Sequence, residues 1–193
     1  LVHVVDLTDR TATAAMLDAL DDEGVAVDLL VNNAGFGDRG LLHERPWSKL
    51  EALLELNVVT ATFLIHRLVP GMIARGSGAI LNVGSIAGIV AKPGSAVYGS
   101  SKSYLNALGE ALHAELSSAG IVVTTVLPGP VPTEFGEMAV KSDAAPVRDT
   151  ANDGAPSSRS SPFKLPKVFV VSAEDCAEQA VQALVHGHAR VVP

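Results

Sequence analysis

The stretch VDLLVNNAG, residues 27–35, is a short apolar run that passes directly into a polar turn ending in glycine. Continuous apolar runs of this length are typical of strands that are buried on both faces of a parallel sheet. Three other runs have the same character, and they cover residues 1–7, 78–85 and 121–129. Longer segments with helical periodicity separate the runs. This alternation predicts an α/β fold with a doubly wound parallel sheet and helices on both of its faces.

Start and stop signals bound the helical segments. Gly24 ends the first predicted helix, which covers residues 8–23. Ser48 and Glu51 have the spacing of a capping box, so we expect the second helix to begin there and to run towards Met72. The remaining predicted elements are helices at about 96–119 and 173–185 and a short strand at 189–192.

Composition limits the class of protein. The 193 residues, 48% of them hydrophobic, suffice for one well-buried domain, which we expect to cover residues 1–193. A net charge of −7 without basic runs argues against a nucleic-acid partner. The single cysteine, Cys176, rules out an internal disulfide and suits a reducing compartment, so we expect a cytoplasmic protein. We expect no membrane span, because no apolar run approaches ~20 residues, and no metal site, because the six histidines lack ligand companions.

The stretch AVYGSSKSYLNALGEAL, residues 96–112, places a tyrosine and a lysine one helical turn apart. Tyr98 and Lys102 therefore share a helix face, where the ammonium can approach the phenol. One interpretation is a surface pair without a function. The other is proton transfer, because a nearby ammonium can lower the phenol pKa of ~10 by ~1–3 units. Ser85, at the end of a predicted strand, faces the same crevice and can hold a substrate oxygen.

These features together resemble the classical type of the short-chain dehydrogenase/reductase family. The resemblance rests on Tyr-x-x-x-Lys at 98–102, a serine thirteen residues earlier, Asn-Asn-Ala-Gly at 32–35 and Asn57 in the next predicted helix. It implies a Rossmann-like fold and an oxidoreductase that uses NAD or NADP. Such an enzyme interconverts an alcohol and a ketone or aldehyde by hydride transfer.

The resemblance also implies roles for single residues. Tyr98 would be the general acid/base, and Lys102 would lower the pKa of Tyr98 and bind the nicotinamide ribose. Ser85 would polarise the substrate oxygen, and Asn57 would help to hold a water for proton relay. The other residues implied to contact the cofactor, with Asp6 at the adenine ring, are Asp6, Asn33, Ala34, Gly35, Pro128, Gly129, Val131 and Thr133.

Some of these residues have simpler interpretations. Asn57 could be a solvated polar position, Ser85 the cap of a turn and Asp6 a turn former at the end of a strand. A serine hydrolase is excluded, because NVGSIAG around Ser85 lacks the glycine that a G-x-S-x-G elbow places two residues before the serine.

Residues 137–167 interrupt the alternation with many Pro, Ser, Asp and Gly residues. This segment is either a flexible surface excursion or a lid over the substrate. The apolar residues in and directly after it favour a hydrophobic alcohol or ketone, although they could simply anchor the segment; they are Phe163, Leu165, Val168 and Phe169. The family commonly pairs two of its long helices between subunits, so the resemblance implies a homodimer or homotetramer.

The sequence departs from the family pattern at its beginning. The family opens with a strand and a T-G-x-x-x-G-x-G turn that holds the pyrophosphate, and the printed sequence contains neither. The run at 1–7 then corresponds to the family's third strand and would lack neighbours, because the first two strands lie beside it in the doubly wound order. We therefore expect an incomplete record of a longer protein, in which NAD and NADP preference is not readable. The alternative is a non-catalytic fragment or relic that cannot bind the cofactor tightly.

Overall fold

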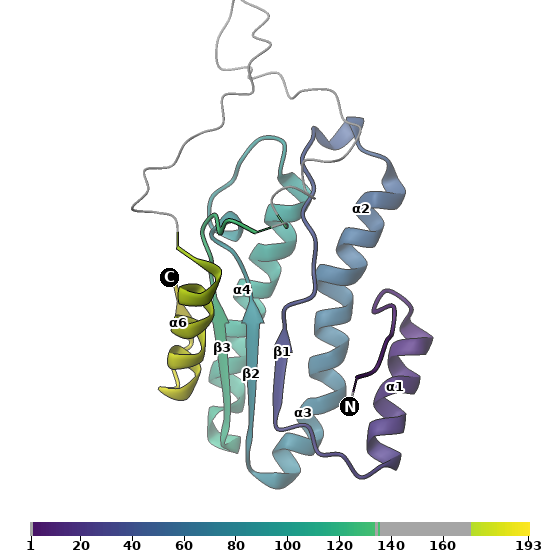
Figure 1. Cartoon of the computed structure of the whole chain (residues 1–193), viewed down its shortest axis with the longest axis vertical. Coiled ribbons are helices and arrows are strands. Elements are labelled where there is room, and N and C mark those ends of the chain that lie inside the picture. The colour runs from purple at the N-terminus through teal and green to yellow at the C-terminus, as the bar shows by residue number, and fades with distance from the viewer. Residues whose placement is uncertain (1, 134, 136–170) are drawn as a thin grey trace, which may run out of the picture.

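The computed structural model describes residues 2–133, 135 and 171–193. Four parallel strands in this part of the chain form one sheet, in the order β1-β2-β3-β4 (Figure 1). The predicted α/β class with a parallel sheet is therefore confirmed. The strands are β1 (Leu29–Asn32), β2 (Gly78–Val83), β3 (Ile121–Val126) and β4 (Arg190–Val191).

Within the described ranges five α-helices accompany these strands, and local caps explain where two of them begin. The Asp9 side chain accepts a hydrogen bond from the Ala12 amide at the start of α1, and Ser172 accepts one from the Asp175 amide at the start of α6. The last helix has the predicted bounds. The helices are α1 (Arg10–Asp22), α2 (Trp47–Leu54), α3 (Ala61–Arg75), α4 (Ala96–Leu116) and α6 (Ala173–Val185).

Two apolar clusters form the core, one on each face of the sheet. α3 and α4 cover one face, and α6 covers the other face over β2 and β3 (Figure 1). Helices on both faces are therefore confirmed for the middle of the sheet. The first cluster contains Leu30, Ile65, Met72, Ile80, Leu116, Ile121 and Val123, and the second contains Leu81, Val126, Cys176, Ala180 and Leu184.

The predicted strand at residues 1–7 is wrong, because residues 2–7 pair with no other described strand. Val2 and Val4 are 89% and 95% exposed. A strand needs neighbours for its amides and carbonyls, and the described residues offer none at this edge of the sheet. The expectation that this run would lack neighbours agrees with its structure.

The predicted capping box at Ser48 and Glu51 is also wrong. α2 begins at Trp47, one residue earlier, and Pro46 occupies the cap position without a side-chain hydrogen bond. The Pro46 carbonyl accepts hydrogen bonds from the amides of Lys49 and Leu50, at 3.1 Å and 3.4 Å. Proline suits this position because its fixed φ and missing N–H cost nothing at a helix start.

α2 and α3 form one continuous helical run from Trp47 to Arg75, joined by a π-helical turn at Glu55–Thr60. By length and apolar composition this run could cross a membrane. That is weak evidence, because the core helix of a globular protein meets the same criteria, and Ile65 and Met72 of this run belong to the sheet's core. The expected absence of a membrane span therefore stays a prediction.

Candidate active site

The segments that follow β2 and β3 lie side by side at the carboxyl ends of the strands. The Gly84 amide donates to the Val126 carbonyl at 2.8 Å, and the Ile86 amide donates to the Pro128 carbonyl at 3.1 Å. These bonds place Ser85 beside Pro128. Ligands of open parallel sheets bind at this edge, so the predicted residues lie where a site is expected.

Asn57 lies in the π-helical turn between α2 and α3 and is buried. Its side-chain oxygen accepts from the Phe36 amide at 3.1 Å, and its Nδ2 donates to the Phe36 carbonyl at 3.0 Å and to Ser101 Oγ at 3.2 Å. π-helical turns are frequent at functional sites because they displace one side chain from the regular pattern. Asn57 thus joins the loop after β1 to α4, and a solvated position is excluded.

Lys102 is buried one helical turn after Tyr98, so the interpretation as a surface pair is wrong. Lys102 Nζ donates to the Val83 carbonyl at 2.7 Å, and Ser101 Oγ donates to the Tyr98 carbonyl at 2.7 Å. Gly35 approaches the same place: a Cβ there would lie 2.8 Å from Asn57 Oδ1 and 3.7 Å from Lys102 Nζ. Any residue larger than glycine at position 35 would therefore collide with the Asn57 side chain.

Burial dominates the proton affinities at the site. Burial raises the pKa of Tyr98 above its usual value, and the hydroxyl of Ser85 opposes this rise without cancelling it. Burial also lowers the pKa of Lys102 from 10.5 to about 8. The net pKa of Tyr98 is therefore raised where the sequence analysis expected it to be lowered, because burial outweighs the opposing contributions, and the Lys102 ammonium donates to the Val83 carbonyl.

Ser85 caps a short 3₁₀ turn, as its simpler interpretation predicts. Its Oγ accepts a hydrogen bond from the Ala87 amide at 3.0 Å. Its own O–H makes only a long, weak hydrogen bond, of 3.5 Å, to the Pro128 carbonyl. The hydroxyl can therefore still donate to a substrate oxygen. The Asn106 side chain on α4 donates to the Ser85 carbonyl at 3.1 Å and so fixes the backbone of the serine. The sequence analysis missed Asn106, which the helical spacing from Lys102 could have indicated.

The structure leaves Asp6 outside this cluster. The Asp6 carboxylate is exposed and accepts from the Thr8 hydroxyl at 2.7 Å and the Thr8 amide at 2.9 Å. These bonds hold the pKa of Asp6 below its usual value. Asp6 is therefore the turn former that the simpler interpretation described, and its contact with adenine stays a prediction.

The other residues implied to bind cofactor lie in the loops that follow β1 and β3. Asn33 and Ala34 are exposed directly after β1, and Gly35 is half-buried. Phe135, which the sequence analysis did not single out, lies beside Tyr98, and the centroids of the two rings are 6.0 Å apart. The residues after β3 range from half-buried to exposed; they are Pro128, Gly129, Val131 and Thr133. The predicted lid at 137–167, with Phe163, Leu165, Val168 and Phe169, lies outside the described residues.

The donors at the site fit the nicotinamide end of NAD or NADP. The Lys102 ammonium carries three N–H donors, and Val83 accepts one of them. Glycine at position 35 keeps open the space beside Asn57 and Lys102 that a side chain would fill. A ribose offers hydroxyl oxygens of the kind that such a buried ammonium requires.

Comparison with known proteins identifies relatives of this chain. The family model "short chain dehydrogenase" matches residues 1–144. The human protein named dehydrogenase/reductase SDR family member 7 is 32% identical over 180 residues, which are 92% of this chain and 52% of that protein. Inactive 2-(S)-hydroxypropyl-CoM dehydrogenase 2 from Xanthobacter autotrophicus is 36% identical over 143 residues, which are 73% of this chain and 62% of that protein.

Solved structures show the same relationship. A short-chain dehydrogenase from Sphingobium yanoikuyae in complex with NADPH matches with a TM-score of 0.78 and 26% identity, over 98% of this chain and 65% of that chain. The chain spans about half the length of several curated relatives that it matches. The family model covers most of the sequence and agrees with the geometry described above. The chain therefore belongs to the short-chain dehydrogenase/reductase family.

Proposed function

We propose that the protein is an NAD(P)-dependent oxidoreductase that interconverts an alcohol and a ketone or aldehyde, with Tyr98 as the general acid/base. The observation that carries this proposal is the position of four side chains at the carboxyl ends of β1, β2 and β3. These side chains are Asn57, Ser85, Tyr98 and Lys102. Ser101 Oγ bridges Asn57 Nδ2 and the Tyr98 carbonyl, and Lys102 Nζ donates to the Val83 carbonyl.

The chain's own residues supply the proton chemistry. A nicotinamide cofactor, held at the ribose by Lys102, would supply the hydride in reduction and take it up in oxidation. Tyr98 donates its phenolic proton to the carbonyl oxygen in reduction, and Ser85 O–H donates a hydrogen bond to the same oxygen. The raised pKa of Tyr98 keeps the phenol protonated at neutral pH, as a general acid requires.

Lys102 acts after the proton has left Tyr98. With a pKa of about 8, Lys102 is mostly charged at neutral pH, and its ammonium stabilises the phenolate electrostatically. Its remaining N–H donors would hold the nicotinamide ribose. Asn57 keeps the loop after β1 in contact with α4, which preserves the space beside Gly35.

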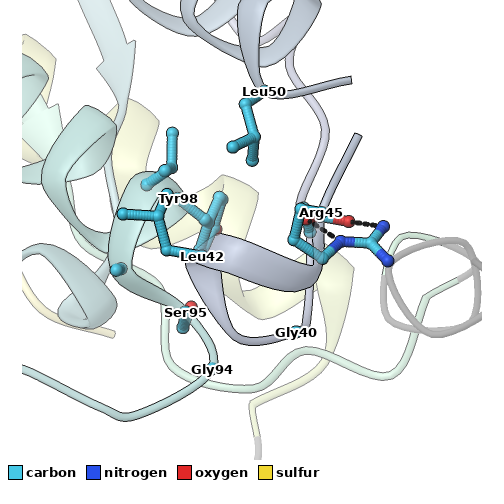
Figure 2. A pocket seen from close by; sticks show the side chains of 10 residues that line it. Gly40, Leu42, Arg45, Leu50, Gly94, Ser95 and Tyr98 are labelled. Carbon is cyan, nitrogen blue, oxygen red and sulfur yellow. Dashed lines mark hydrogen bonds and ion pairs between the residues drawn. The ribbon is translucent and has the colours of Figure 1, made fainter. Parts of the chain in front are cut away.

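We further propose that the substrate is apolar beside the reacting carbon. Leu42, Leu50 and Val97 line a small cavity that Tyr98 also borders (Figure 2). Among the described residues that line this cavity, Arg45 carries the one guanidinium, and Asp38 neutralises it, so these residues offer a substrate carboxylate no unpaired charge. We also propose a homodimer or homotetramer and a cytoplasmic location.

Replacing Tyr98 with phenylalanine tests the proposed chemistry. Tyr98→Phe removes the transferred proton but keeps the ring and its contact with Phe135. We expect kcat/KM for carbonyl reduction to fall by about 10²–10⁴-fold, the usual contribution of a general acid. The affinity for NADPH or NADH, followed by fluorescence titration, should stay within about twofold because the phenol proton is not needed for binding.

Tyr104→Phe is the matched control. Tyr104 lies on the same helix, and its hydroxyl contacts Thr62 at the surface, 3.0 Å away. We expect this variant to keep full activity. Retention of full activity by Tyr98→Phe would refute the proposed mechanism.

The second candidate is a non-catalytic protein of the same family. The relative from Xanthobacter autotrophicus, whose name describes it as inactive, supports this candidate. It predicts no turnover of any carbonyl substrate by the wild type and no tight binding in the same fluorescence titration. Tight NADPH or NADH binding together with turnover excludes it.

A further inference from the structure

The loop between β1 and α2 contains a buried ion pair that the proposed mechanism does not use. The side chains of Asp38 and Arg45 are 5% and 4% exposed, and Arg45 Nε and Nη2 donate to the two Asp38 oxygens at 2.7 Å and 2.6 Å. Burial by itself would raise the pKa of Asp38, but hydrogen bonds from Arg45 and Lys49 hold it below its usual value. The bidentate pair is therefore charged and geometrically specific.

This ion pair holds a backbone that touches the start of α4. Gly40 lies inside the loop closed by Asp38 and Arg45, and its amide donates to the Gly94 carbonyl at 2.9 Å. Gly40 has φ of +155°, and a Cβ there would collide with the Arg45 side chain. The Arg45 stem thus packs directly against the residue that makes the contact.

The contact at Gly94 lies four residues before Tyr98 in the sequence. Ser95 follows as the cap residue of α4, and its carbonyl accepts from the Gly99 amide at 2.8 Å. Figure 2 shows Gly40 and Gly94 close together, with Tyr98 and Leu42 on the other side of the same cavity. The Arg45 guanidinium points away from Tyr98 in this view, so it acts on the tyrosine only through the loop.

We propose that Asp38 and Arg45 are positioning residues for Tyr98. Their ion pair holds Gly40 against Gly94, which fixes the first turn of α4 and the phenol relative to Ser85. This inference rests on the proposed function, because it assumes that the position of Tyr98 limits the reaction. Small displacements of a reacting group cost much activity: about 1 Å can reduce the rate about 100-fold.

The decisive experiment removes both charges together. Asp38→Leu/Arg45→Met leaves no unpaired buried charge, and apolar replacement of a buried ion pair is often neutral for stability. We expect this double variant to keep its unfolding temperature and its NADPH affinity, while kcat falls by about 10–100-fold. Lys49→Met is the matched control, since Lys49 contacts the same carboxylate from a more exposed side chain, 30% accessible. We expect its kcat to stay within about twofold.

A spectroscopic measurement separates positioning from a purely structural role. In a Tyr104→Phe background the absorbance of the phenolate reports Tyr98 alone, since the sequence has two tyrosines. We expect the Tyr98 pKa to fall towards its usual value in the double variant, because a loosened first turn admits water to the phenol. A variant with unchanged stability, unchanged kcat and an unchanged phenol titration overturns the proposal.

Arg45→Lys provides a second test should the double variant fail to fold. Lysine keeps the positive charge but loses the two-pronged geometry, so we expect kcat to fall by about three- to tenfold. Full activity of Arg45→Lys overturns the proposal. If Tyr98→Phe loses activity while the Asp38 and Arg45 variants keep it, only the positioning role is refuted and the proposed function stands. Full activity of Tyr98→Phe would instead refute the proposed function.

Discussion

β1 and β3 are apolar strands of one sheet, but their surroundings differ. β3 pairs with β2 and β4, and five of its six residues are buried. β1 pairs only with β2 among the described strands, and its Leu29 and Val31 remain 48% and 46% exposed. An apolar run therefore indicates a strand without indicating how many of its faces are covered.

The same difference divides the candidate site. Ser85 and Lys102 lie at the covered half of the sheet, where hydrogen bonds to β2, to α4 and to the segment after β3 hold them in place. Asp6 and Asn33 lie on the side of β1 and are exposed. We expect substitutions in the covered half to have the larger effects, and the following predictions test this from the largest effect to the smallest.

We expect the largest effect in the covered half from replacing Lys102 with methionine, measured as the pH dependence of the free energy of unfolding. The Lys102 pKa is about 8 in the folded protein and 10.5 without burial. Between about pH 8 and pH 10.5 the Lys102 side chain is protonated in the unfolded chain and neutral in the folded protein. The contribution of this group to the free energy of unfolding therefore rises with pH. Relative to Lys102→Met, the wild type should gain about 3 kcal/mol over this window. Urea unfolding from pH 7 to 10.5 measures the gain.

Lys102→Arg is the control for that measurement, because arginine stays charged across the whole window. Its stability relative to the wild type should change with pH by the same amount as that of Lys102→Met. A constant difference between wild type and both variants would contradict the lowered pKa of Lys102.

Truncating one valine in each strand compares the two regions directly. Val123 on β3 is fully buried, whereas Val31 on β1 is half exposed. We expect Val123→Ala to lower the free energy of unfolding by about 2 kcal/mol and Val31→Ala by about 0.5 kcal/mol. Urea midpoints at unchanged m-values give both numbers. Equal losses would show that β1 is covered as well as β3.

A polar substitution of similar shape should have the smallest effect. Val31→Thr keeps the β-branch and exposes its hydroxyl, so we expect a change within about 0.5 kcal/mol. In Val123→Thr a hydroxyl replaces a methyl group at a fully buried site. Burying this hydroxyl should lower the free energy of unfolding by about 1–3 kcal/mol. A large loss in Val31→Thr would indicate that a further part of the protein covers this face.

Features that depend on neighbouring residues could be predicted from the sequence. The apolar runs and helical periods identified the three central strands and the later helices, because side-chain direction repeats locally along each element. Tyr98 and Lys102 lie one turn apart on the same helix, as their spacing predicts. The helix at Ala173–Val185 had its predicted bounds, since Ser172 is a local cap.

Features that depend on long-range packing required the tertiary structure. The run at 1–7 is not a strand because pairing needs a neighbour that its own composition does not report. Asn106 beneath Ser85 and the Asp38–Arg45 pair arise only when distant segments meet. The raised pKa of Tyr98 belongs to the same class, because it is set by burial and no spacing of residues encodes it. The sequence by itself determined most of the elements and the candidate reactive residues, because these follow from local spacing, whereas packing decided their partners and proton affinities.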